Sequence, residues 1–131
     1  MDIPTTTSSA ANGVYSMLVS ALDAMYEHAH EASLDDFAHY LALARSELDF
    51  GPWHAPHAYP LDERLPFVDG IQAVHRLLIA LREETPDDQI AHLTIALAWH
   101  WISDGIADLD RQAARIAARL RRAANASAVG A

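Results

Sequence analysis

The segment 98–110, AWHWISDGIADLD, holds the densest group of side chains that could perform chemistry. His100, Asp104 and Asp108 are four residues apart, and residues at that spacing share one face of a helix. Imidazole and carboxylate groups bind divalent zinc, iron or manganese, and they also transfer protons. The alternative is a solvated helix face whose acids pair with arginines of the same domain. The candidate arginines are Arg45, Arg76 and Arg82.

Three histidines lie on or beside apolar helix faces, where a site between helices would be built. They are His28, His75 and His100. Together with Asp104 they form the set that the sequence predicts as ligands of a divalent transition metal. The pairs His-x-x-x-His and His-x-x-x-Glu of some metal-binding bundles do not occur in the chain. Each histidine could instead be a buried side chain bonded to a backbone carbonyl or an acid.

Two tryptophans, Trp53 and Trp101, join some of these side chains in a predicted ligand-binding site. Trp53 belongs to the segment 50–66, FGPWHAPHAYPLDERLP, and could line the mouth of a pocket. The predicted ligand-binding residues are Trp53, His75, His100, Trp101 and Asp104. The alternative is that the segment is an aromatic strap packed over the helices. No P-loop, nucleophile elbow or helix-turn-helix pattern accompanies these residues.

Hydrophobic periodicity predicts an all-α fold with four helices and no strand. The helices are expected at about 14–32, 34–49, 67–84 and 87–123, within a single bundle domain of residues 13–124. Four prolines and a glycine exclude a long helix from 50–66, which is therefore a crossover. Its length allows the third helix to run parallel or antiparallel to the second. Residues 1–12 and 125–131 are predicted to be disordered.

The last predicted helix changes character halfway along its length. Its first half is apolar on two faces, so we expect the bundle to bury both. The faces comprise Ile90, Leu93, Leu97 and Trp101 on one side, and Ile95, Trp99 and Ile102 on the other. Gly105 could break or kink the helix there, but one glycine inside a helix costs only about 1 kcal/mol. We therefore expect a continuous, extended helix, with a fold-back at Gly105 as the alternative.

Only the second face continues beyond Gly105, with residues alternately three and four apart. This spacing is a heptad repeat, which is typical of helices that pair along an apolar seam. We call this set the heptad stripe: Ile106, Leu109, Ala113, Ile116 and Leu120. The stripe predicts that the second half of the helix projects from the bundle and that the protein is a homodimer.

Composition and charge disfavour several classes of protein. The net charge is −9, which disfavours nucleic acid or an anionic membrane as partner, although residues 111–122 carry five arginines and no acid. The chain has no cysteine, no lysine, no apolar run that could span a membrane and no signal peptide pattern. We expect a soluble, cytoplasmic, bacterial protein. The first hypothesis is a homodimeric bundle that binds a partner protein or small ligand. The second is a small metal-dependent or acid–base enzyme.

Overall fold

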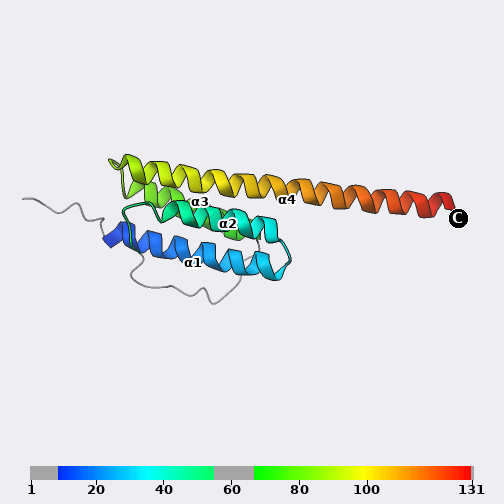
Figure 1. Cartoon of the computed structure of the whole chain (residues 1–131), viewed down its shortest axis with the longest axis horizontal. Coiled ribbons are helices and arrows are strands. Elements are labelled where there is room, and N and C mark those ends of the chain that lie inside the picture. The colour runs from blue at the N-terminus through cyan, green and yellow to red at the C-terminus, as the bar shows by residue number, and fades with distance from the viewer. Residues whose placement is uncertain (1–8, 55–66, 131) are drawn as a thin grey trace, which may run out of the picture.

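Four helices make up the fold in the computed structural model, which describes residues 9–54 and 67–130. The helices are α1 (Ser9–Glu31), α2 (Asp35–Leu48), α3 (Phe67–Glu83) and α4 (Gln89–Gly130). The described residues contain no strand, and the helices pack as one bundle (Figure 1). The prediction of an all-α, four-helix bundle-like domain is confirmed. Most of the predicted crossover, residues 55–66, lies outside the described residues.

The four helices are arranged so that neighbours run antiparallel. The short turns at residues 32–34 and 84–88 join α1 to α2 and α3 to α4, and chains that reverse so quickly pair antiparallel. Figure 1 shows α3 running in the same direction as α2. Within the described residues, α1 and α4 each pack on both α2 and α3. The orientation that the sequence left open is therefore parallel for α2 and α3.

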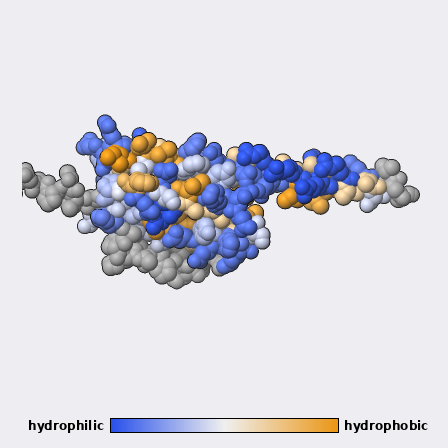
Figure 2. All heavy atoms as spheres, in the orientation of Figure 1, coloured by the Kyte–Doolittle hydropathy of each residue, from blue (hydrophilic) through white to orange (hydrophobic). Residues whose placement is uncertain are grey.

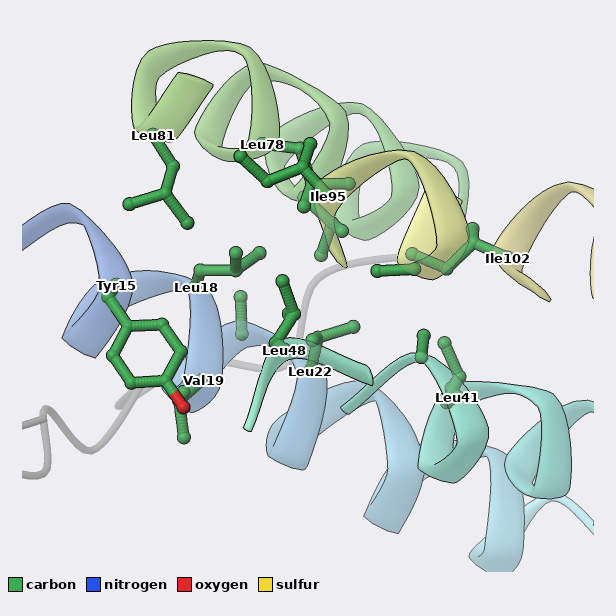
Figure 3. Packing of buried hydrophobic residues seen from close by; sticks show 14 of the residues in the cluster. Tyr15, Leu18, Val19, Leu22, Leu41, Leu48, Leu78, Leu81, Ile95 and Ile102 are labelled. Atoms are coloured by element: carbon green, nitrogen blue, oxygen red, sulfur yellow. The ribbon is translucent and has the colours of Figure 1, made fainter. Parts of the chain in front are cut away.

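The core lies between the four helices, and its side chains point inward from all of them (Figure 3). Small residues of α4, among them Ala91 and Ala98, are completely buried and allow α4 to lie close to α2. The largest fully buried side chains are Leu18 and Leu22 of α1, Phe37, Leu41 and Leu48 of α2, Val74, Leu78 and Leu81 of α3, and Ile102 of α4. This packing holds α4 along its first half.

One face of α4 that we expected to be buried is exposed. Ile90 is 64% exposed and Leu93 is 60% exposed, and Leu97 is exposed to a smaller extent. The core contacts of this half are made by alanines and a threonine together with Ile95 and Ile102. Because Ala91, Thr94 and Ala98 are small or polar, hydrophobic periodicity does not identify them as core-facing residues. The expectation that both apolar faces are buried was therefore wrong.

The helix boundaries differ from the expected ones mainly at the chain ends. α1 begins at Ser9 rather than near residue 14, and completely buried Ala11 anchors its first turn. α4 runs to Gly130 rather than to about residue 123, because its last part is rich in alanine, the best helix former. Residues 9–12 and 125–130, expected to be disordered, are therefore helical. α4 begins at Gln89, where the Asp88 carboxylate accepts the Ala91 N–H at 2.9 Å.

α4 is continuous through Gly105 and extends far beyond the other helices (Figure 1). Its 42 residues correspond to about 63 Å at 1.5 Å per residue. The expectation of continuity is confirmed, and the fold-back is excluded. The bundle ends near Leu109, so residues 111–130 form a helix with no neighbour among the described residues. We call these residues the projecting half of α4.

Candidate functional site

The predicted group of His100, Asp104 and Asp108 on α4 is reduced in the structure to one pair, His100 and Asp104. His100 Nε2 lies 3.4 Å from Asp104 Oδ2; the His100 side chain is largely exposed, and that of Asp104 is about half exposed. Asp108 is mostly buried and is engaged within its own helix, where Gln112 Nε2 donates to it at 3.2 Å and Arg111 lies at 3.5 Å. Asp104 pairs with His100, and Asp108 pairs with Arg111, rather than with the expected Arg45, Arg76 or Arg82.

His75 is an exposed residue of α3. Its ring stacks on the ring of Trp99, with centroids 4.3 Å apart and planes inclined by 24°. His28 is half-buried on α1. No group of three His, Asp or Glu side chains that could hold a metal ion occurs among residues 9–54 and 67–130. Of the four predicted metal ligands, the structure pairs only His100 with Asp104.

The two predicted ligand-binding tryptophans each hold α2 in place. Trp53 is 4% exposed, donates its indole N–H to the Leu48 carbonyl at 2.9 Å and packs on Tyr15 of α1. Trp101 donates its indole N–H to Glu47 Oε1 at 3.2 Å. Both indole N–H groups are therefore already bonded to protein. Of the five predicted ligand residues, three lie on α4, His75 lies on α3 and Trp53 follows α2.

A polar cluster between α1 and α2 was not predicted from the sequence. Arg45 forms an ion pair with Asp49 one turn later, and Arg45 Nε lies 3.9 Å from Asp23 Oδ1 of α1. The Tyr15 hydroxyl donates to Asp49 Oδ1 at 3.3 Å and lies 3.5 Å from Arg45 Nη1. The i,i+4 spacing of Arg45 and Asp49 was the only signal for this cluster. One arginine faces two carboxylates, so the cluster keeps a net negative charge, and its contacts tie α1 to α2.

Burial controls the protonation equilibria of this cluster. Desolvation raises the pKa of the Tyr15 phenol above its ordinary value of 10.0, against the opposing charge of Arg45. Desolvation also raises the pKa of the Asp23 carboxyl, and Arg45 again opposes the shift. Partial burial lowers the pKa of Arg45, but its hydrogen bond to Asp49 and the nearby negative charges outweigh that effect, so the pKa is raised. The arginine therefore remains charged in the cluster.

Comparison with protein-family models, curated proteins and solved structures finds no match to this chain. In the described residues, no helix is both long and apolar enough to cross a membrane.

The heptad stripe begins at the end of the core and continues along the projecting half of α4. Ile106 and Leu109 are half-buried against the end of the core, whereas Ile116 is 56% exposed and Leu120 is 66% exposed. Leu120 follows Ile102 by eighteen residues, which is five helical turns, so it lies on the face that is fully buried inside the bundle. Figure 2 shows hydrophobic side chains along this projecting half. The core-facing surface of α4 therefore continues beyond the core.

The charge of the projecting half is opposite to that of the bundle. Residues 111–131 carry five arginines and no acid, whereas residues 1–110 carry all 18 acids and four arginines. The five arginines are exposed: Arg111, Arg115, Arg119, Arg121 and Arg122. The projecting half is thus an amphipathic, basic helix attached to an acidic bundle.

Proposed function

We propose that the protein is a helical-bundle interaction protein that forms a homodimer through the heptad stripe and binds a partner protein or a small ligand. The observation that carries this proposal is the exposure of Ile116 and Leu120 on the core-facing side of α4. Scattered exposed apolar residues are normal on protein surfaces. Here, however, the two side chains extend a buried stripe in register, and that pattern supports a docking surface.

The energetics of the projecting half also support a partner. Burying an Ile or Leu side chain contributes about 1.5–3 kcal/mol. A dimer would bury Ile116 and Leu120 from both copies and would cover the half-exposed Leu109. Without a partner, the last five turns of α4 are stabilised only by helix propensity and by continuity with the bundle. The absence of cysteine fits a reducing compartment, and we place the protein in the cytoplasm as part of the same proposal.

Sedimentation velocity on the full chain tests this proposal. The wild type should sediment as a dimer at about micromolar concentration, and Leu120→Asp should convert it to a monomer with an unchanged bundle. The matched control is Leu93→Asp, because Leu93 is an equally exposed leucine on the first half of α4. It should leave the dimer intact. A monomeric wild type would contradict the proposal, and so would a dimer that dissociates in Leu93→Asp but persists in Leu120→Asp.

A small metal-dependent or acid–base enzyme is a second candidate, supported by the His100–Asp104 pair. A carboxylate beside an imidazole orients the ring and can assist proton transfer. The pair is exposed, and it lacks a third group of the kind that would hold substrate or metal among the described residues. Elemental analysis of the purified protein tests the metal-dependent form. About one transition metal per chain, lost in His100→Gln, would favour this candidate over a purely binding function.

A further inference from the structure

We propose that the two copies of the dimer meet in an antiparallel arrangement, in which the projecting half of each α4 packs against that of the other. The C-terminal end of each α4 then approaches the α1–α2 turn of the other copy, and the two bundles lie at opposite ends of the assembly. This inference rests on the proposed function and adds the orientation and the surface that the partner uses.

The first argument is steric. The heptad stripe lies on the same face of α4 as Ile102, which is fully buried under the other helices of the bundle. A partner helix that ran parallel along the stripe would continue toward the N-terminal end of α4, into space that α2 and α3 occupy. α4 has no break at Gly105 that could turn the helix away. A partner helix can therefore follow the stripe only if it arrives from beyond the end of the bundle and runs antiparallel.

The second argument is charge complementarity. In a parallel pair, the arginines of one projecting half would lie beside those of the other, far from both acidic bundles. In an antiparallel pair, each arginine-bearing half lies between its own bundle and that of its partner. The bundle end that it approaches carries exposed acids at the α1–α2 turn. These acids are Glu31, Asp35 and Asp36.

Distance measurement between labels on the full chain tests this orientation. Because the protein has no cysteine, Ala96→Cys and Ala114→Cys each provide one labelling site. Both alanines are exposed and lie on the same face of α4, since eighteen residues, or five turns, separate them. In an antiparallel dimer overlapping over residues 111–130, labels at position 96 would be about 70 Å apart along the helix axis, and those at position 114 about 20 Å.

Mixing donor-labelled and acceptor-labelled protein separates the possible results. Strong energy transfer at position 114 with little at position 96 is the expected result. Strong transfer at both positions would indicate a parallel dimer, which would overturn this inference but leave the proposed homodimer standing. Transfer at position 96 alone would indicate a dimer through the first half of α4. It would overturn both the antiparallel arrangement and the proposed dimer through the heptad stripe. Absence of transfer at both positions, together with a monomer by sedimentation, would also overturn both.

Discussion

Gly105 of α4 lies against Tyr40 of α2 so closely that a Cβ atom added to Gly105 would be 2.9 Å from the Tyr40 Cβ atom. The same added atom would be 3.1 Å from Phe37 Cδ2, and Phe37 is one of the fully buried core residues. The Tyr40 Cβ atom is fixed to the backbone of α2, so it cannot move away as the end of a flexible side chain could. Gly105 is therefore the point where the two helices approach each other, and it is not a hinge.

We predict that Gly105→Ala destabilises the protein although alanine is the better helix former. Replacing a mid-helix glycine by alanine gains about 1 kcal/mol in propensity. Overpacking a filled core costs about 1–3 kcal/mol. The added methyl must push α4 away from α2 along an extensive contact, so we expect a net loss of up to about 2 kcal/mol in the free energy of unfolding. Urea denaturation followed by circular dichroism measures this change.

Gly13→Ala is the matched control for that substitution. Gly13 also lies inside a helix, α1, but a Cβ atom there would have nothing within 4 Å. We expect the propensity gain alone, a stabilisation of up to about 1 kcal/mol. If both alanine variants are stabilised, the close approach of α4 to α2 at Gly105 does not constrain the fold.

Two isoleucines of α4 test which of its faces belongs to the core. Ile102 is completely buried, whereas Ile90 is 64% exposed. Ile102→Ala should cost about 2–5 kcal/mol, because it removes buried methyl groups and leaves a cavity. Ile90→Ala should change the unfolding free energy by less than about 0.5 kcal/mol. Equal losses in the two variants would mean that the Ile90 face is covered, by the protein itself or by a second copy.

The sequence predicted the fold class because the apolar stripes of α1 and α3 are continuous and the turn signals between helices are strong. It misassigned the faces of α4 because the core contacts there are made largely by small side chains such as Ala91 and Ala98. Such residues pack closely without appearing in a hydrophobic pattern. The orientation of α3 could not be derived, since the long crossover permits both directions.

The candidate site was less predictable than the fold, because it depends on contacts between helices. The i,i+4 spacing correctly placed His100 beside Asp104, as one helix fixes both residues. The stacking of His75 on Trp99 joins α3 to α4. It depends on how the two helices are rotated relative to each other, and the sequence pattern does not determine that rotation. The contact between Tyr15 and Arg45 was not predicted for the same reason, because it joins α1 to α2.

The core is confined to the part of α4 that ends near Leu109, so removing residues 113–131 should leave the bundle folded. The described side chains beyond Gln112 are not buried. We expect the truncated chain to be monomeric and to unfold with a free energy within about 1 kcal/mol of the Leu120→Asp monomer. A second truncation after Gly105 is the control. It also removes Ile106 and Leu109, which pack on the core, and should lower stability clearly.

The Tyr15 cluster predicts how stability changes at alkaline pH. Burial raises the pKa of the Tyr15 phenol above 10.0, and the charge of Arg45 only partly opposes this effect. Because the folded state favours the protonated phenol, the contribution to stability is fully present below pH 10.0, the unfolded value. It is lost as the pH rises through the higher folded value.

Tyr15→Phe should therefore remove part of the alkaline loss of stability. Near neutral pH the variant loses the hydrogen bond to Asp49, at a cost of about 0.5–1.5 kcal/mol. This deficit relative to wild type should shrink above pH 10.0, because only the wild type must then ionise a buried phenol. Tyr26→Phe, at an exposed tyrosine of the same helix, should follow the wild-type profile. Urea unfolding between pH 8 and 11 measures the profiles, and a Tyr15→Phe deficit that stays constant across this range would contradict the assignment.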